Sequence, residues 1–392
     1  MELSIKKILI LLGGGLLTTF SYSGWAVQSC AFDQGSSTVS LIVPLNPGVI
    51  SVGADIPVGT IIYQGAWTNT PSYMLCLIDQ PPAYYNWAVS IVHAPLGLSG
   101  LNTGPFAGAV YNTNIPGIGV AISRYNDRSA AVMGTPGYRD EDIEIGDGGS
   151  FATLSSSTRY VSLIKIGPLT PGSYTIEASS FPTASDDILN SRFASPIQGL
   201  PLRLNNVTFQ GNLTVSTQTC ATPNVAVTLG SYEIHDYFTM INSTTPWVDA
   251  SITLTNCPIF HGFYNQSNPA KMINFNTGLT PDTSSTNNSI GVRLTPTTEV
   301  LDAANGVMAI DPTIAGAASG VGIQLGWGES SQTPTLFNLA AEQSMMLPKD
   351  GNSAIRVPLA ARYIQNDCDS YAGQSKWQSG VYDQLLLIHQ VC

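Results

Sequence analysis

Apolar and polar residues alternate through most of the chain, with the period of two that β-strands show. Clusters of Gly, Pro, Asn or Ser bound the alternating segments. A sustained 3.6-residue apolar stripe is absent, and residues 336–346 are the best helical candidate. The predicted class is all-β, with sandwiches favoured over barrels because strand lengths and turn spacings are irregular. The pattern predicts strands at residues 40–44, 59–63, 87–92, 117–123, 160–166, 213–216, 224–230, 250–256, 290–294, 320–326 and 354–365.

Composition supports this class and argues against two others. Only 10% of the 392 residues are charged, the net charge is −11, and the chain contains 37 Gly and 25 Pro. An acidic chain with few lysines has no basic stripe for a phosphate backbone, so nucleic acid is not expected as a partner. A hydrophobic content of 43% is too high for an intrinsically disordered chain.

The N-terminus has the features of a secretory signal peptide. Lys6 and Lys7 precede an apolar stretch at residues 8–20, and Gly24 and Ala26 stand at positions −3 and −1 of a cleavage site. The stretch is shorter than the roughly 20 residues that span a bilayer, which favours a removed leader, residues 1–26, over a membrane anchor.

Six cysteines follow the predicted leader, and in an exported chain they favour disulfides over metal ligands. There is no CxxC motif, and the four histidines lie outside zinc spacing, so we expect neither a metal nor another cofactor. Sequence order predicts the pairs Cys30–Cys76 and Cys220–Cys257, each closing a loop of about 40 residues.

A small, polar stretch at residues 211–219 marks a boundary between two domains. The sequence after it starts again with a new cysteine pair and a new series of strands. We therefore predict one domain at residues 27–215 and a second at residues 216–392, both of ordinary domain size.

Four motifs of the second predicted domain occur in a characteristic order. Cys220-x-x-Pro precedes one strand, and Cys257-Pro ends another. The stretch SGVGIQL then contributes Gly320, Gly322 and Ile323, and VPLAARYIQ contributes Arg362 and Tyr363. In this order and spacing, residues 216–366 resemble the pilin domain of chaperone–usher fimbriae of Gram-negative bacteria.

The first predicted domain resembles the N-terminal receptor-binding domain of two-domain fimbrial tip adhesins. It begins with Cys30 shortly after the leader, has Cys76 46 residues later and contains the motif DIPVGT at residues 55–60. A leader, a disulfide-bearing β domain and a pilin domain together have the layout of such an adhesin.

The resemblance implies a fold and a set of partners. The pilin domain would be an immunoglobulin-like sandwich without its last strand, with an apolar groove that exposes unpaired backbone groups. A periplasmic chaperone would fill the groove first, and the next fimbrial subunit would then donate a strand there after passage through an outer-membrane usher. The chain would be displayed on the cell surface at a fimbrial tip, where its first domain would bind a host glycan or matrix protein without catalysing a reaction.

The tail after residue 365 departs from the resemblance. The family ends in a Pro-Gly-Lys-Ala-Asn-Gly type of turn, an alternating strand and a terminal aromatic residue, whereas this chain ends in a different sequence. Shifted forward by one nucleotide, residues 372–378 can encode that turn, and residues 381–388 can encode an alternating segment and a stop codon. We therefore hypothesise a frameshift near residues 364–368, which the nucleotide sequence decides. The alternative is a native C-terminus in which Cys368 bonds Cys392.

Aromatic and amide side chains of the first domain are candidates for receptor binding. Aromatic rings pack on sugar C–H groups, Asn and Asp bind hydroxyls, and loops on a rigid sandwich can carry both. A structural role is the alternative for each ring, because Tyr and Trp are also common in β cores. The candidates are Trp67, Tyr84, Tyr85, Trp87, Tyr125, Asn126 and Asp127.

Other chemistry has weaker signals. The acidic run at residues 138–147 could bind Ca²⁺ or a cationic patch, but its spacing is not that of an EF-hand, and a solvated loop is the preferred interpretation. The sequence has no motif of a serine hydrolase, a metalloprotease or a nucleotide-binding enzyme. Two alternatives to an adhesin remain, namely a non-adhesive minor or adaptor subunit and a secreted carbohydrate-active enzyme.

Overall fold

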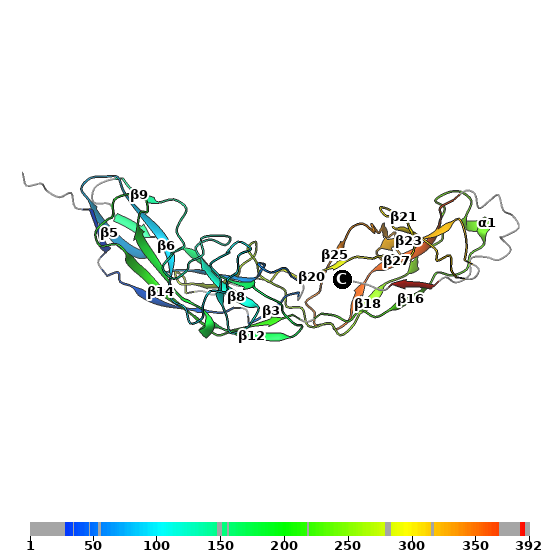
Figure 1. Cartoon of the computed structure of the whole chain (residues 1–392), viewed down its shortest axis with the longest axis horizontal. Helices are drawn as coiled ribbons and strands as arrows, with labels where there is room; N and C mark the ends of the chain where they lie inside the picture. Colours follow the sequence, from blue (N-terminus) through cyan, green and yellow to red (C-terminus); the bar gives the residue numbers. More distant parts are fainter. Residues whose placement is uncertain are drawn as a thin grey trace, which may run out of the picture.

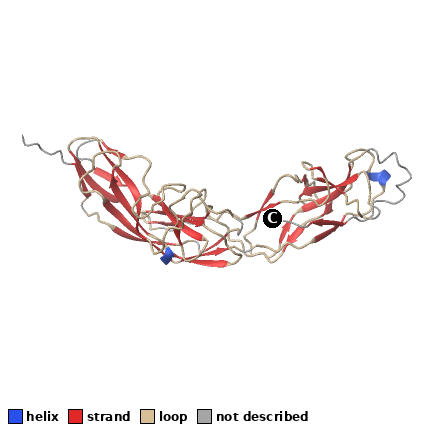
Figure 2. Cartoon of the chain, in the orientation of Figure 1, coloured by secondary structure: helices blue, strands red, loops and turns tan. Residues whose placement is uncertain are grey.

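The chain forms two β-rich lobes that lie end to end along its long axis (Figure 1). Strands dominate both lobes (Figure 2), and the helices among the described residues are the single turns η1 (Ala178–Ser180) and α1 (Ile234–Tyr237). The predicted all-β class is therefore confirmed. The structure, a computed structural model, describes residues 28–388 except 34, 47, 54–55, 147–150, 155–156, 218, 279–283, 315–316 and 368–384. The predicted leader lies outside these residues.

The described part of the first lobe contains two five-stranded and two three-stranded sheets. One five-stranded sheet has the order β19 (Ala270–Asn274), β4 (Ile61–Thr68), β11 (Thr158–Lys165), β8 (Ile118–Ser123) and β7 (Tyr111–Asn112). The other has the order β2 (Val39–Pro44), β14 (Leu202–Gln210), β13 (Thr183–Asn190), β6 (Ala83–His93) and β9 (Ile143–Ile145). The three-stranded sheets are β1 (Gln28–Phe32), β5 (Ser72–Ile78) and β10 (Phe151–Leu154), and β12 (Ser173–Glu177), β15 (Asn212–Ser216) and β3 (Val49–Ser51).

The main core of the first lobe is built from both five-stranded sheets. Val43 and Val89 of one sheet belong to the same buried cluster as Ile122 and Val161 of the other. The apolar side chains of alternating strands thus meet between two sheets, as in a sandwich. The central strands β8 and β11 are almost entirely buried; β8 is apolar apart from its last residue, whereas β11 also buries the polar side chains of Arg159, Ser162 and Lys165.

The second lobe has its own buried cluster around a six-stranded sheet. The predicted strand segments of both lobes each overlap an observed strand. The large sheet has the order β17 (Val248–Asp249), β27 (Leu359–Gln365), β23 (Val321–Trp327), β22 (Val307–Ala309) and β21 (Val300–Asp302), and β24 (Thr335–Leu336) also pairs with β23. The two-stranded sheets are β16 (Val225–Thr228) with β28 (Leu385–Ile388), β18 (Ile252–Leu254) with β26 (Ile355–Val357), and β20 (Ser289–Val292) with β25 (Gln343–Met346).

The best helical candidate of the sequence, residues 336–346, is not a helix. The segment contains the end of β24, a turn and the strand β25. Phe337 and Leu339 are both buried, and this spacing of two fits extended chain rather than a helix. The side-chain oxygen of Asn338 accepts a hydrogen bond from the backbone N–H of Ala340 at 2.9 Å, a local bond that competes with helix formation.

Most of the tail at issue in the frameshift hypothesis lies outside the described residues, including both of its cysteines. Near the end of this tail, the described strand β28 pairs antiparallel with β16, with Ile388 opposite Val225. The reading frame stays a hypothesis.

One segment of the second half of the sequence lies against the first lobe. We call residues 259–278 the crossing segment; it contains β19, which pairs in parallel with β4 so that Ala270 lies opposite Gly65. The segment thus covers a sheet edge that would otherwise expose unpaired backbone groups. Its backbone bonds to the first lobe run from Ser51 N to Gly262 O (2.9 Å), from Gln64 N to Tyr264 O (3.1 Å) and from Phe275 N to Thr68 O (3.0 Å).

Side chains of the crossing segment also belong to the main core of the first lobe. Tyr264, Ala270 and Met272 are buried there, and the ring of Tyr264 packs edge-on against Tyr63 at 6.2 Å between centroids. A Cβ atom on Gly65 would lie 2.5 Å from the sulfur of Met272, so the glycine leaves room for this side chain. The predicted domain boundary after residue 215 stays a prediction, but it does not account for this segment.

Candidate functional site

Two disulfides anchor the two lobes. Cys30 and Cys76 are bonded across the paired strands β1 and β5, and Cys220 is bonded to Cys257 in the second lobe. This is the pairing that the order of the cysteines predicts.

Three of the predicted receptor-binding aromatic residues are core residues. Trp67, Tyr85 and Trp87 are 1%, 4% and 9% exposed, so their rings stabilise the first lobe and are not available to a ligand at the surface. Tyr84 points the other way on β6, and its hydroxyl donates to a carboxylate oxygen of Glu144 at 3.3 Å. The alternation along β6 thus separates neighbouring tyrosines into a buried and a more exposed one.

A buried ion pair lies next to Trp87. Arg159 and Asp186 are both almost fully buried, and a guanidinium nitrogen lies 2.6 Å from the carboxylate. Asn69 donates its amide to the same carboxylate at 2.8 Å. The guanidinium groups of Arg159 and Arg124 lie 5.1 and 5.3 Å from the Trp87 ring centroid. Arg124, the first residue of the loop described next, thus lies over the same ring as the arginine of the buried ion pair.

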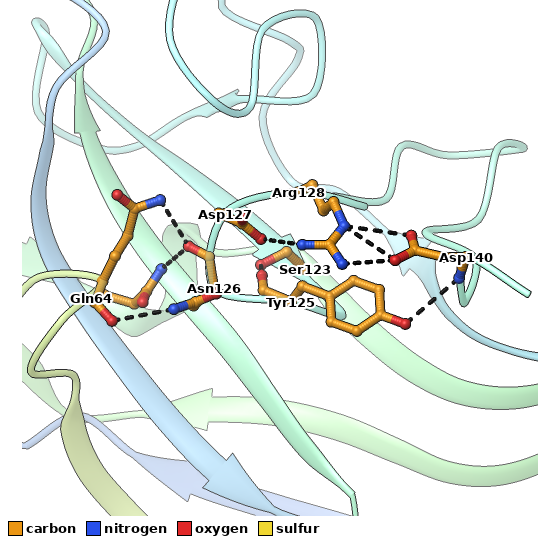
Figure 3. A network of polar contacts seen from close by, with 8 residues as sticks. Gln64, Ser123, Tyr125, Asn126, Asp127, Arg128 and Asp140 are labelled. Atoms are coloured by element: carbon orange, nitrogen blue, oxygen red, sulfur yellow. Dashed lines mark hydrogen bonds and ion pairs between the residues drawn. The ribbon is translucent and has the colours of Figure 1, made fainter.

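The loop at residues 124–129 contains the other predicted binding residues (Figure 3). Arg128 lies between Asp127 and Asp140, with nitrogen–oxygen distances of 2.8 and 2.6 Å, and its guanidinium carbon is 4.3 Å from the centroid of the Tyr125 ring. The backbone N–H of Asp140 donates to the Tyr125 hydroxyl at 3.4 Å. The hydrogen bonds from Arg128 hold the pKa of Asp140 below its ordinary value. The loop is thus tied to the chain around residue 140.

Asn126 at the tip of this loop bonds the crossing segment. Its side-chain amide donates to the backbone oxygen of Gln266 at 3.1 Å. Its own backbone oxygen accepts from the side-chain amides of Gln64 and Gln266, at 2.7 and 3.2 Å. Tyr125, Asn126 and Asp127 are therefore brought together, but the Asn126 side chain serves an internal contact. A single sequence offers no signal for this contact, since the partners are 140 residues apart.

A surface pocket of about 480 Å³ adjoins the loop. Two arginines that line it, Arg139 and Arg192, form no ion pair within the described residues. The guanidinium carbon of Arg192 lies 4.5 Å from the Tyr138 ring centroid, and the neighbouring Phe193 is 84% exposed. Hydroxyls, guanidinium donors, an aromatic face and one carboxylate suit hydrogen bonding to a polar ligand with some apolar surface. The lining residues are Ser129, Ala130, Thr135, Pro136, Gly137, Tyr138, Arg139, Asp140 and Arg192.

The sequence interpretation missed most of this pocket. The sequence feature that could have indicated the pocket is the pair Arg192-Phe193. It places an arginine and a large aromatic residue in a polar stretch of a chain that contains few basic residues. Gly137 has a structural part, because a Cβ atom there would collide with the backbone oxygen of Ser129. The close contact between these two backbones forms one wall of the pocket.

The acidic run at residues 138–147 is engaged by protein partners in its described part. Asp140 pairs with Arg128, and Asp142 accepts hydrogen bonds from Asn86 at 2.7 Å and from the hydroxyl of Ser191. Asp147 lies outside the described residues. Within the described chain, no group of three or more His, Cys, Asp or Glu side chains is arranged to hold a metal ion.

The motif residues of the second lobe meet on two paired strands. Gly322 and Ile323 on β23 lie opposite Ile364 and Tyr363 on β27. A Cβ atom on Gly322 would lie 2.8 Å from the backbone oxygen of Met308, so the strand needs glycine here. Next to this pair, Arg362 donates to the Gln324 side chain at 2.7 Å, and its guanidinium carbon lies 4.1 Å from the Trp247 ring centroid. Gly320, the residue just before β23, has a φ of +75°.

The helices that the structure describes are single turns, and none has the length or apolar character to cross a membrane.

Comparisons with known proteins agree with the sequence resemblance. Residues 43–196 match the family model of the MrkD-like receptor binding domain. No curated protein matches the chain. Among solved structures, the CupB6 tip adhesin from Pseudomonas aeruginosa is similar at 15% identity, with 88% of this chain and 90% of that chain covered and a TM-score of 0.26. The receptor binding domain of the adhesin MrkD1P of Klebsiella pneumoniae is similar at 21% identity over 50% of this chain and 98% of that chain, with a TM-score of 0.28.

The family match lies in the first lobe. The match includes β6, β8, β11 and the loop and pocket described above. Residues 43–196 are therefore similar to the MrkD-like receptor binding domain, and the chain resembles the two-domain tip adhesins of chaperone–usher fimbriae.

Proposed function

We propose that this protein is a fimbrial tip adhesin that binds a host surface receptor, a glycan or a matrix protein, at the pocket beside residues 124–129. The observation that carries the proposal is the overlap of the pocket with the matched family. All of its lining residues, from Ser129 to Arg192, fall within residues 43–196.

The chemistry of the pocket supports a receptor with hydroxyl groups. Ser129 and Thr135 offer hydroxyls, Arg139 and Arg192 offer guanidinium donors, and Tyr138 offers a ring. Ligand sites commonly combine a few such polar groups with an aromatic surface, which favours a glycan.

A matrix protein is the second candidate because of Phe193. This ring is 84% exposed and follows the lining residue Arg192, and Met133, which is 57% exposed, precedes the lining residue Thr135 by two positions. Exposed aromatic, Met and Arg side chains are enriched in protein interfaces.

The second lobe, on this proposal, joins the fibre by accepting a strand from the next subunit. The pilin motif around Arg362 and the separation of the small β16–β28 sheet from the six-stranded sheet support this role. We further propose export through the periplasm with a chaperone, passage through an usher and display at the fimbrial tip. We also propose that the two domains comprise residues 27–215 and 216–392. On this division, the crossing segment belongs to the second domain by sequence but packs against the first lobe.

Binding of the full chain to a glycan array and to a coated panel of matrix proteins tests the proposal. The variant Arg192→Ala removes a pocket guanidinium, and we expect it to weaken binding by about tenfold or more, as for a central arginine of an interface. Arg293→Ala is the matched control, because it removes an exposed arginine from the second lobe.

The outcomes separate the rival functions. Loss of binding in Arg192→Ala but not in Arg293→Ala supports the adhesin. Equal binding by both variants places the receptor site elsewhere, and no binding on either panel favours an adaptor subunit. Hydrolysis of array oligosaccharides would instead favour a carbohydrate-active enzyme.

A further inference from the structure

The crossing segment lies against the loop that carries the pocket wall, and the two are joined by side-chain bonds as well as by the shared core. We propose that Gln266, with Asn126, is a positioning residue for the pocket, so that the chain of the second lobe completes the binding site of the first. The effect on ligand affinity rests on the proposed function, whereas the positioning itself does not.

The first step is the fixed position of the crossing segment. Its strand β19 continues the sheet beyond β4, and Met272 is fully buried in the first core. Gln266 lies in a tight turn just before this strand, closed by backbone hydrogen bonds in both directions between Asn265 and Asn268. The turn is therefore held by the first lobe on one side and by its own hydrogen bonds on the other.

The second step is a reciprocal pair of hydrogen bonds. Asn126 Nδ2 donates to the Gln266 backbone oxygen at 3.1 Å, and Gln266 Nε2 donates to the Asn126 backbone oxygen at 3.2 Å. The same Asn126 oxygen accepts a second hydrogen bond, from the fully buried Gln64. The loop tip is thus clamped between a buried side chain of β4 and the crossing segment (Figure 3).

The third step connects the loop tip to the pocket. The backbone N–H of Arg124 donates to the Ser129 oxygen at 3.1 Å, which closes the loop on itself. Ser129 has a φ of +55°, which is unusual for a residue with a side chain, and its backbone lies close against Gly137 in the same wall of the pocket. Through Arg128 the loop also holds Asp140. A displacement at Asn126 would therefore move two parts of the pocket lining.

Hydrogen exchange on the full chain tests this positioning without a ligand. We compare Gln266→Ala and Asn126→Ala with the control Asn268→Ala. Asn268 lies in the same turn as Gln266, but its side-chain amide donates hydrogen bonds to Ser284 and Thr286 and none to the loop at residues 124–129. Losing a hydrogen bond worth about 0.5–1.5 kcal/mol should make the amides of residues 124–130 exchange roughly two- to tenfold faster in the first two variants only.

A double variant distinguishes positioning from general destabilisation. Because each side chain donates to the other residue's backbone oxygen, each variant removes a different hydrogen bond, so the double variant should exchange faster than either single variant at residues 124–130 and nowhere else. Faster exchange confined to residues 124–130 supports the proposal. Unchanged exchange there in both single variants, or equal changes in Asn268→Ala, overturns it.

Binding to the glycan array and the matrix-protein panel adds the functional readout. On any surface that the unchanged chain binds, Gln266→Ala and Asn126→Ala should weaken binding and Asn268→Ala should not. If Arg192→Ala weakens binding but Gln266→Ala and Asn126→Ala do not, the proposed effect of positioning on affinity is overturned. If the unchanged chain binds neither panel, the proposed function fails, and the exchange data alone decide the positioning.

Discussion

Met272 provides a sharp test of the structure, because it belongs by sequence to the second half of the chain and by packing to the first lobe. Its side chain is fully buried among residues of the first core and lies over Gly65 of β4. Replacing a buried Met by Ala removes its packing and leaves a cavity, at a cost of about 2–5 kcal/mol. We therefore expect Met272→Ala to destabilise the first lobe by this amount while leaving the second lobe unchanged.

Hydrogen exchange measured by mass spectrometry can assign this loss to a lobe. The slowest amides of β4 and β11 should exchange at least about 30-fold faster in Met272→Ala, the equivalent of about 2 kcal/mol. Those of β23 and β27 should not change. The control is Met346→Ala, since Met346 is 74% exposed and should change stability by no more than about 0.5 kcal/mol. Faster exchange in the second lobe instead, or equal effects of the two variants, would refute the crossing of the segment.

Three further predictions concern the site. Asp186→Ala should destabilise the first lobe by about 3–5 kcal/mol in urea unfolding, because it leaves the buried charge of Arg159 without its partner. The pKa of Asp140 is lowered in the folded chain, so its ion pair with Arg128 should protect the loop fully at pH values above the ordinary pKa of 3.8. This protection should be lost as the pH falls through the lowered pKa, and hydrogen exchange of the loop between pH 5 and about 2 measures the loss. Phe193→Ser should leave the unfolding midpoint almost unchanged while weakening receptor binding, and a large stability loss would contradict its 84% exposure.

The strands were predictable where alternation and turn residues coincide. The segments at residues 320–326 and 354–365 became β23 and the pair β26 and β27, since their apolar faces are continuous and Gly or Pro bounds them. β19 could not be found in this way. Its sequence AKMIN is short, and it is a strand because the edge of β4 is available to it, a partner about 200 residues earlier in the chain.

The candidate site was predictable only in part, for a related reason. Residue type indicated Trp67 and Trp87 as ligand contacts, but both face inward on their strands. Where a strand has apolar residues on both faces, a single sequence does not determine which face points into the core. Tyr125 and Asp127 do lie in the loop that adjoins the pocket. Arg192 comes to the same place from the loop after β13, and its proximity depends on tertiary contacts that the sequence does not show.

The central claim is that the pocket beside residues 124–129 binds the receptor. A crystal structure of the full chain with a ligand identified on the array or the matrix panel tests it most directly. We predict that the ligand contacts Tyr138 and Arg192, with Ser129 or Asp140 within hydrogen-bond distance. A ligand bound at any other surface of the chain, with the pocket unoccupied, would contradict the claim.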